Sequence, residues 1–332
     1  MPELKYLILE GTDPARNLAA EQYVFDVLPR DCSYLMLWQN DNAVIIGKYQ
    51  NTLAEINKPY VDAHGIRVVR RLSGGGAVYH DLGNLNFTFI ADAGDTETLD
   101  LELFCQPVVR TLAALGVTAQ VNGRNDITID GQKFSGNSQY MRGGRIMHHG
   151  TLLFDSDLSV VAKALQVDES KIQAKGLRSV RSRVTNIRPH LAQDRTLEEF
   201  RETLLQNILR ETPGEEYRFT REDLACIEAL RRERYAAWDW NFGSSPPCTL
   251  LRRRRFEGCG TVEARFFVEH GLISALCFQG DFFSTDEPEE LAARFVGRRP
   301  EREDFAAALE GVEVSRYFLG LDREGLLSLL AE

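Results

Sequence analysis

Hydrophobic positions near the start of the chain change from a helical spacing to short apolar runs. Asp13 and Pro14 come directly before the helical part, and an aspartate followed by a proline is a favoured way to begin a helix. The later runs are rich in β-branched and aromatic residues and are separated by Asn, Gly and Asp, which is typical of strands. We therefore expect a helix with apolar positions at Leu18, Ala19, Tyr23, Phe25 and Leu28, followed by strands over residues 34–38, 43–47, 66–70, 77–79 and 86–90.

Helix and hairpin signals alternate in the middle of the chain. A helix is expected over residues 99–115, where Pro107 should kink it or delay its start. The turn Asp130-Gly131 lies between residues 127–129 and a strand from Lys133, which predicts a hairpin. Further helices are expected to open at residues 155–157, at the capping box of Thr196 with Glu199, and at the similar pair Thr220 and Asp223.

Residues 241–248, Asn-Phe-Gly-Ser-Ser-Pro-Pro-Cys, are the clearest break in this pattern. Such a segment cannot continue the helix before it. The chain of 332 residues also exceeds the usual size of one domain. We expect a large domain over residues 1–243, a linker over 244–248, and a small C-terminal domain over 249–332. The last should have strands near 249–256, 262–268 and 273–278 and helices opening at 286, 301 and 322.

The composition is that of a globular protein and narrows the function classes. The chain is 43% hydrophobic and 27% charged, and its longest apolar runs are too short to cross a bilayer. A formal charge of −10 argues against binding to nucleic acid, in spite of the four arginines at 252–255. The six cysteines form no CxxC pair, and the N-terminus lacks a secretory signal, so a cytoplasmic location is expected.

Residues 70–84, Arg-Arg-Leu-Ser-Gly-Gly-Gly-Ala-Val-Tyr-His-Asp-Leu-Gly-Asn, are the first segment with a candidate chemistry. Three consecutive glycines can present successive N–H groups to an anion, and Arg71 adds a fixed positive charge. The spacing fits neither the P-loop nor the GxGxxG dinucleotide motif. Considered alone, the triplet is either a phosphate or oxyanion site or, more often, a flexible turn.

Residues 123–138 contain the second candidate. Lys133 leaves a hairpin strand just before Ser-Gly-Asn, where its ammonium could bridge the oxygens of a carboxylate and a phosphate. Asn125 offers an amide for base or phosphate contacts, and Asp126 offers a carboxylate for Mg²⁺, which prefers oxygen ligands. Taken singly, each of these side chains is more commonly a solvated surface group.

Two further segments carry histidine or positive charge. His148 and His149 are neighbours in an expected strand and should point to opposite faces, so a shared metal is not expected. One of them is a candidate for lining a site. Residues 175–186 hold four cations over nine residues, which indicates a solvated face or a contact with an acidic ligand or partner.

In this order, the segments resemble the lipoate–protein ligase A family over nearly the whole chain. The most specific match is Arg-Arg-x-Ser-Gly-Gly-Gly-Ala-Val with His-Asp-x-Gly-Asn behind it, combined with Lys133-x-Ser-Gly. Asn137-Ser138 departs from the small residue pair that family members often have. Residues 35–38, 44–47, 123–138, 148–151, 175–186 and 238–243 also match.

The resemblance implies an α+β protein: a biotin/lipoate–protein ligase-like catalytic domain with a mixed β-sheet flanked by helices, and a small α+β C-terminal domain. It also implies a reaction. Lipoate and ATP form lipoyl-AMP, with Mg²⁺ present, and the lipoyl group passes to a lysine of an apo acceptor. The acceptors implied are lipoyl domains of 2-oxoacid dehydrogenase complexes and the glycine-cleavage H protein.

The resemblance also implies roles for individual residues. Lys133 would be catalytic and would contact both the lipoyl carboxylate and the α-phosphate. The residues implied for ATP and adenylate binding are Arg71, Gly75, Gly76, Ala77, Val78, Tyr79, Asn125 and Asp126, with Asp126 also implied for Mg²⁺. Those implied for lipoate binding are Trp38, Ser73, His80, Lys133 and His149.

Two other functions compete with ligation. An octanoyl or lipoyl transferase of the same fold would need a cysteine nucleophile in the cleft. None of the six cysteines lies within residues 65–84, 123–150 or 175–186, which counts against a transferase. A protein that only binds lipoate would be expected to have lost Lys133 or Arg71, and both are present.

Overall fold

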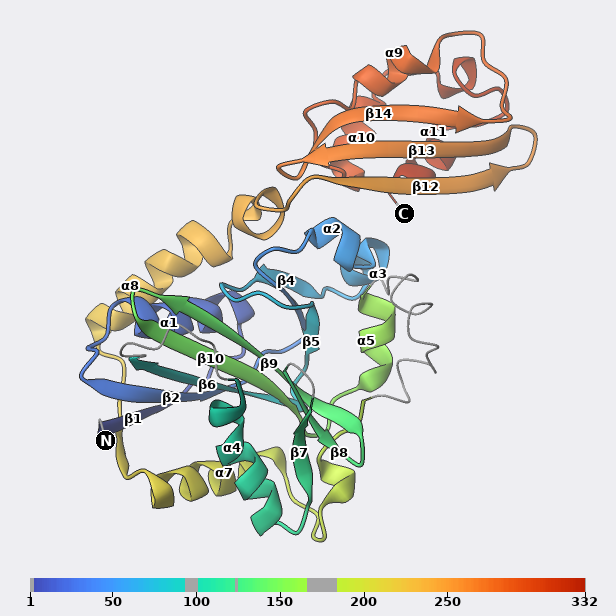
Figure 1. Ribbon diagram of the computed structural model, residues 1–332. Coiled ribbons are helices and arrows are strands. Elements are labelled where there is room, and N and C mark those ends of the chain that lie inside the picture. Colours follow the sequence, from blue (N-terminus) through green and yellow to red (C-terminus); the bar gives the residue numbers. More distant parts are fainter. Residues whose placement is uncertain (1–2, 93–100, 123–124, 166–183, 332) are drawn as a thin grey trace. The chain divides into compact units, whose positions relative to one another are not determined.

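The computed structural model describes residues 3–92, 101–122, 125–165 and 184–331 (Figure 1). The chain divides into two compact units, one of Met1–Lys48 with Gly65–Ala237 and one of Tyr49–His64 with Trp238–Glu332. Within the described residues, no helix is both long enough and apolar enough to span a membrane.

The first unit is built on a mixed sheet. Its strands are β1 (Glu3–Ile8), β2 (Cys32–Trp38), β3 (Ala43–Ile46), β4 (Arg67–Arg70), β5 (Val78–His80), β6 (Asn84–Asp92), β7 (Ala119–Asn122), β8 (Asp126–Ile129), β9 (Gln132–Arg142), β10 (Arg145–Leu153) and β11 (Gly214–Glu216). Eight of them form one sheet in the order β11-β1-β2-β6-β10-β9-β8-β7. β1 is parallel to both neighbours, and β2 pairs antiparallel with β6. A second sheet has the order β4-β3-β5.

Helices cover both faces of the large sheet (Figure 1). The helices of this unit are α1 (Pro14–Asp26), α4 (Leu101–Ala114), α5 (Leu158–Ala164), η2 (Arg188–His190), α7 (Leu197–Glu211), α8 (Arg221–Leu230) and η3 (Arg231–Tyr235). α4 and α7 lie on one face, where Leu112 and Leu204 share a core with Phe87 and Phe134 of the sheet. α1 lies on the other face, and most of its side chains are buried. The sheet is therefore enclosed, and a polar side chain pointing from either face needs a partner.

Local sequence signals account for several of these elements. Asp13 caps α1 through its side chain, and Pro14 is the first helical residue. Thr196 and Glu199 form the expected capping box of α7, and Thr220 and Asp223 form that of α8. Asp130 (φ 50°) and its neighbour Gly131 (φ 76°) make the tight turn between β8 and β9, which confirms the predicted hairpin.

The second unit combines a segment from early in the chain with the C-terminal part. Its elements are α2 (Thr52–Glu55), α3 (Lys58–Ala63), η4 (Asp239–Gly243), β12 (Cys248–Phe256), β13 (Gly260–Glu269), β14 (Leu272–Gly280), α9 (Pro288–Ala293), α10 (Arg302–Ala308), η5 (Val314–Arg316) and α11 (Arg323–Leu330). The three strands form an antiparallel sheet in chain order. Leu53 joins the apolar core of this unit, and Thr52 Oγ1 donates a hydrogen bond of 2.5 Å to the carbonyl of Asn241.

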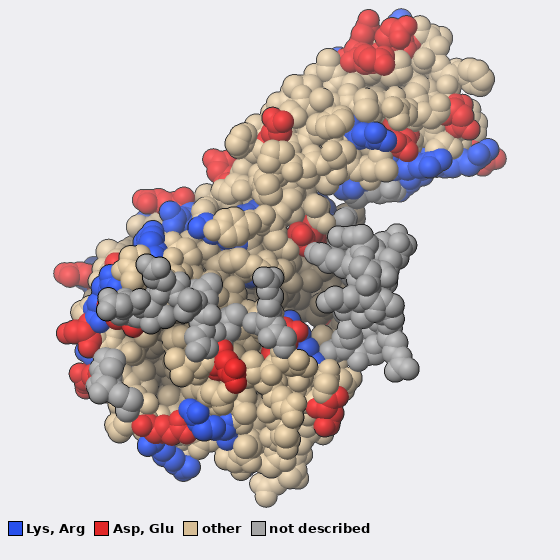
Figure 2. All heavy atoms as spheres, viewed as in Figure 1, with Lys and Arg blue, Asp and Glu red and all other residues tan. Residues whose placement is uncertain are grey.

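The four consecutive arginines belong to β12, at the edge of this sheet. Lys and Arg side chains gather in a row over this strand in Figure 2. The side chains alternate: Arg253 and Arg255 are exposed, whereas Arg254 is half-buried and its Nη1 donates to Ser328 Oγ at 2.8 Å. The four arginines therefore lie on an edge strand, and the pleat of the strand places alternate arginines on opposite faces of the sheet.

The predicted fold class is confirmed, and the differences from expectation are local. Pro107 lies inside α4, with its carbonyl accepting from Thr111 Oγ1 at 2.9 Å. Residues 49–64 were expected in the first domain but cluster with the second unit. No sequence signal separates them, because their contacts with the C-terminal part are long-range. The linear boundaries 1–243, 244–248 and 249–332 stay a prediction.

Candidate active site

A cavity of about 130 Å³ lies within the first unit. It is formed where α1 and the strands β2, β3, β5, β6, β9 and β10 approach one another. The residues around it are Leu18, Trp38, Ile45, Arg71, Gly75, Gly76, Ala77, Val78, His80, Asn86, Asn125, Lys133, Gly136, Asn137, Ser138, His149, Gly150 and Thr151.

The glycine loop, residues 73–78, folds around the buried side chain of Arg71. The guanidinium donates from Nη2 to the carbonyls of Gly74 at 2.6 Å and Gly76 at 2.9 Å, and from Nη1 to the carbonyl of Ile45 at 3.2 Å. Burial lowers the pKa of Arg71 to about 10, which still leaves it cationic at neutral pH. Arg71 therefore acts in this structure as the internal support of the loop, while it also lines the cavity.

Backbone geometry explains why glycine occupies this loop. Gly75 has φ +92°, a conformation that residues with a Cβ rarely adopt. A Cβ on the neighbouring Gly47 would lie 2.0 Å from the carbonyl oxygen of Gly75, so the two backbones pack directly against each other. A Cβ on Gly76, by contrast, would meet no described atom within 4 Å.

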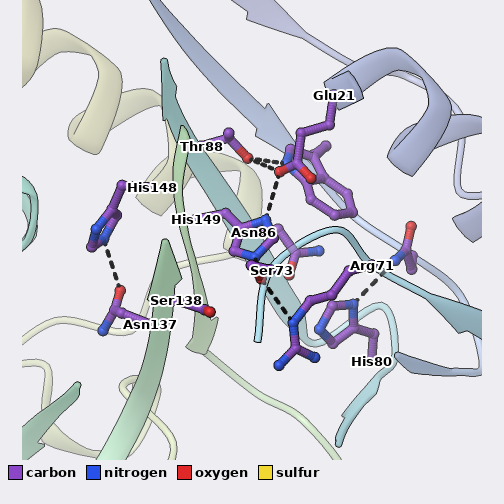
Figure 3. A network of polar contacts seen from close by, with 12 residues as sticks. Glu21, Arg71, Ser73, His80, Asn86, Thr88, Asn137, Ser138, His148 and His149 are labelled. Atoms are coloured by element: carbon purple, nitrogen blue, oxygen red, sulfur yellow. Dashed lines mark hydrogen bonds and ion pairs between the residues drawn. The ribbon is translucent and has the colours of Figure 1, made fainter. Parts of the chain in front are cut away.

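A chain of hydrogen bonds links this loop to α1 (Figure 3). Arg71 Nε donates to Ser73 Oγ at 3.1 Å, and Ser73 Oγ lies 2.6 Å from His149 Nε2. His149 Nδ1 lies 2.9 Å from Glu21 Oε1. Because a carboxylate only accepts, Nδ1 of His149 carries a proton; in the neutral ring, Nε2 is then the acceptor for the serine hydroxyl. The chain therefore runs from one buried cation to one buried anion.

Glu21 receives two hydrogen bonds in this arrangement. Thr88 Oγ1 donates to the same carboxylate oxygen at 2.7 Å, and Trp38 Nε1 donates to Thr88 Oγ1 at 2.9 Å. The side chain of Glu21 is only 2% exposed. Sequence reasoning missed this residue, although the signal was present: Glu21 is three residues from Leu18 and four from Phe25, which places a charge on the apolar face of the helix.

The second histidine of the pair points the other way, as predicted. His148 Nε2 lies 3.9 Å from Cys105 Sγ of α4, and the ring stacks on Phe104 at 5.2 Å between centroids. Burial lowers the pKa of His148 to about 3, so it is neutral at physiological pH. His148 belongs to the core on the α4 side of the sheet, and His149 belongs to the cavity.

Two asparagines hold His80 in one tautomer. Asn17 Nδ2 donates to Asn40 Oδ1 at 3.0 Å, which fixes the orientation of that amide. Asn40 Nδ2 lies 3.1 Å from His80 Nδ1 and therefore donates to it. Burial lowers the pKa of His80 to about 3, so the neutral ring carries its single proton on Nε2.

Lys133 lies at the β8–β9 hairpin and forms an ion pair. Its Nζ is 2.6 Å from Asp126 Oδ1, and both side chains are about one-third exposed, at 36% and 37%. Asn125 and Asn137 bind each other's backbone, with Asn125 Nδ2 donating to the Asn137 carbonyl at 2.9 Å. Ser138 Oγ donates to the Gly74 carbonyl at 2.9 Å, which ties β9 to the glycine loop.

The structure brings most of the expected site residues together. Trp38, Arg71, Gly75, Gly76, Ala77, Val78, His80, Asn125, Lys133 and His149 all line the cavity. Ser73 and Asp126 contact lining residues, whereas Tyr79 Oη donates to Asn42 Oδ1 at 3.1 Å. Residues 123–124 and 175–183 of the expected segments lie outside the described residues. The roles that the resemblance implies for these residues stay predictions.

Comparisons with known proteins give one consistent result. The family described as lipoyl protein ligase A/B catalytic domain matches residues 13–209, and that described as bacterial lipoate protein ligase C-terminus matches residues 245–330. Lipoate-protein ligase LplJ of Bacillus subtilis is 44% identical over 96% of this chain and 97% of its own length.

Two solved structures are also similar. One is a bipartite lipoate protein ligase and its E2 lipoyl domain from Thermoplasma acidophilum, with 29% identity and a TM-score of 0.64 over 74% of this chain and 98% of that chain. The other is a lipoate-protein ligase A bound with ATP, with 28% identity and a TM-score of 0.61 over 73% of this chain and 99% of that chain.

The first prediction compares two neighbouring glycines. Gly75→Ala places a Cβ at a positive φ and 3.0 Å from Arg71 Nη2, whereas Gly76→Ala meets open space. We expect Gly75→Ala to destabilise the first unit by about 1 kcal/mol more than Gly76→Ala, which is a melting temperature lower by roughly 2–4 °C. Differential scanning calorimetry of both variants measures this. Equal melting temperatures would show that the loop relaxes without strain.

The second prediction concerns Glu21→Gln, which keeps the side-chain size but removes the charge that offsets Arg71. The free energy of unfolding should fall by about 2–4 kcal/mol, because a buried cation loses its compensating anion. Glu202→Gln on α7 is the matched control, since Glu202 is exposed. Thermal unfolding of both variants is the measurement. A melting temperature for Glu21→Gln as high as that of the control would contradict the compensating role.

Proposed function

The chain belongs to the lipoate–protein ligase family, and we propose that it activates lipoate with ATP to lipoyl-AMP and then transfers the lipoyl group to a lysine of an apo acceptor domain. Both family matches and the 44% identical relative support this reaction class. The ATP bound in one similar structure supports the choice of co-substrate. The lipoyl domain named with another supports the class of acceptor, which includes dehydrogenase lipoyl domains and the glycine-cleavage H protein.

The observation that carries the proposal is the mixed lining of one cavity. Leu18, Trp38, Ile45 and Val78 give it apolar surface suited to an aliphatic chain. Lys133 gives the same cavity a cation, and the glycine loop gives it open backbone. A small acid with a long apolar tail needs this combination, because its carboxylate and its chain require opposite environments.

Activation joins two anions, so positive charge must be present where they meet. A carboxylate oxygen attacks the α-phosphate of ATP, and pyrophosphate leaves. Lys133 is the residue we assign to both oxygens, since its ammonium is exposed enough to turn from Asp126 towards a substrate. Holding the two reactants in one cavity converts a bimolecular step into an effectively unimolecular one.

Mg²⁺ fits this arrangement through a single carboxylate. Within the described residues, no group of three His, Cys, Asp or Glu side chains could hold a metal ion. Mg²⁺ is, however, commonly held by one or two carboxylates with substrate phosphates. Asp126 would supply the protein oxygen, and the ion would add positive charge to the phosphates. We therefore assign the metal to the nucleotide-bound state.

Transfer requires a neutral lysine amine from the acceptor and an adenylate that water does not reach. The amine attacks the acyl carbon, and AMP leaves with the electron pair of the broken C–O bond. The cavity lies between α1 and the strands, which limits access of water to a bound acyl group.

A cysteine-based transferase is the second candidate, and the position of the cysteines disfavours it. No cysteine occurs among the described residues that line the cavity. Cys105 lies beside His148 but is fully buried on the α4 side of the sheet. A nucleophile there is separated from the cavity by the sheet itself. A protein that only binds lipoate is disfavoured because Lys133 and Arg71 both line the cavity.

The third prediction concerns Lys133→Ala. Removing the cation should slow formation of lipoyl-AMP by about 10²-fold or more. Single-turnover release of pyrophosphate from ATP and lipoate, without acceptor, measures this step. Lys5→Ala is the matched control, because Lys5 also forms an ion pair, with Glu215 at 3.8 Å, but on strand β1. Near wild-type release by Lys133→Ala would refute the assigned role.

The fourth prediction separates ligation from thioester transfer. A variant with Cys32, Cys105 and Cys259 changed to Ala and Cys226, Cys248 and Cys277 changed to Ser should keep substantial ligase activity, because the acyl carrier is a phosphate. Lipoylation of an apo acceptor is followed by intact-protein mass spectrometry. Detection of a thioester-linked acyl group on the wild-type enzyme would replace the ligase assignment with transfer.

A further inference from the structure

Two buried N–H groups beside the cavity meet no acceptor in the part of the chain that the structure describes. They are His80 Nε2 and Asn86 Nδ2. Both residues line the cavity, and they are only 3% and 2% exposed. A buried donor without a partner is destabilising, so one that faces a cavity is expected to bind an acceptor on a ligand or a water molecule there.

The donor role of His80 Nε2 is fixed by the neighbouring Asn40, and Asn86 adds an amide N–H in this structure. His80 Nδ1 accepts from Asn40, which leaves the proton on Nε2. Asn86 Oδ1 accepts from Asn84 Nδ2 at 3.0 Å in this structure, which leaves Asn86 Nδ2 as the donor beside the cavity. His80 cannot turn its donor into an acceptor without losing the hydrogen bond from Asn40. His80 therefore needs an acceptor atom on the molecule that occupies the cavity, and Asn86 Nδ2, as placed in this structure, is a second donor.

The surroundings of these donors are those of an acyl tail. The His80 ring lies edge-on to Trp38, with 6.4 Å between ring centroids, and Leu18 and Ile45 also line the cavity. A saturated chain placed here would exclude water from both donors and would provide no hydrogen-bond acceptor for them. A dithiolane ring offers two sulfur atoms, which are weak acceptors.

We propose that His80 and Asn86 are specificity-determining residues that make the cavity prefer a dithiolane-bearing acid over a saturated acid of the same length. The proposal rests on the proposed function, because it concerns the acid that is activated. Lipoate and octanoate share the eight-carbon chain and the carboxylate and differ in the two sulfurs. A site with buried donors discriminates strongly against an analogue that lacks the acceptor. Sulfur is a weak acceptor, so we expect discrimination of about tenfold.

The first experiment varies the acid and uses the wild-type chain. kcat/KM for pyrophosphate release is measured with ATP and three acids: lipoate, octanoate and 5-cyclopentylpentanoate. The last has the ring shape of lipoate with carbon in place of sulfur, so it separates acceptor chemistry from shape. We expect lipoate to exceed both others by about tenfold. Equal values for lipoate and 5-cyclopentylpentanoate would overturn the proposal.

The second experiment varies the donor. In His80→Asn, the side-chain oxygen takes the place of Nδ1 and still accepts from Asn40, but the Nε2 proton is gone. In His80→Gln, an amide N–H reaches the position of Nε2. We expect the lipoate-to-octanoate ratio of kcat/KM to fall towards unity in His80→Asn and to recover in His80→Gln. If both acids lose the same factor in His80→Asn, the donor serves an oxygen common to both adenylates and the proposal fails.

These outcomes distinguish a failure of the proposed acid selectivity from a failure of the proposed ligase function. A wild-type chain that releases pyrophosphate with none of the three acids would overturn the ligase function, and the selectivity with it. A chain that releases pyrophosphate with all three at equal kcat/KM keeps the ligase function and loses only the selectivity. The wild-type comparison needs no folded variant, so it decides the matter even if His80→Asn does not fold.

Discussion

The buried charge of Arg71 is the constraint on which the site depends. A guanidinium removed from water needs acceptors for its donors, and the glycine loop supplies carbonyls at positions 74 and 76. It also needs a negative charge nearby, which Glu21 provides. The charge of Glu21 raises the pKa of Arg71, and burial lowers that pKa by a larger amount. Ser73 and His149 connect the two. The loop, a strand residue and the first helix are therefore fixed together by one electrostatic requirement.

Much of the fold could be predicted, because its signals are local. The caps of α1, α7 and α8 and the turn after β8 each depend on a few adjacent residues, and all of them form as expected. The short strands β1 and β11 and the helices α2 and α3 escaped prediction. Their residues show little periodicity, and long-range contacts define them instead, as Leu53 in the core of the second unit illustrates.

Only those residues of the site that belong to a recognisable sequence motif could be predicted. The glycine loop and Lys133 stand out by composition, whereas Asn40 and Asn86 look ordinary in the sequence and Glu21 differs only as a charge on the apolar face of α1. Their importance comes from what the fold places next to them: His149 against Glu21, His80 against Asn40, and the cavity against Asn86. Pairings between residues so far apart in the chain have no local signature, so only the three-dimensional structure shows them.

The two principal cations of the site differ in how firmly they are held. Arg71 is buried and makes several hydrogen bonds to the loop, so moving its charge would mean dismantling that loop. Lys133 is about one-third exposed and is paired with a single carboxylate that is equally exposed, so its ammonium can change partner at little cost. The proposed reaction first joins two anions and then releases AMP, and it would use both kinds of charge. The fixed charge preserves the shape of the cavity, and in the proposed reaction the adjustable charge would follow the negative charge as it moves.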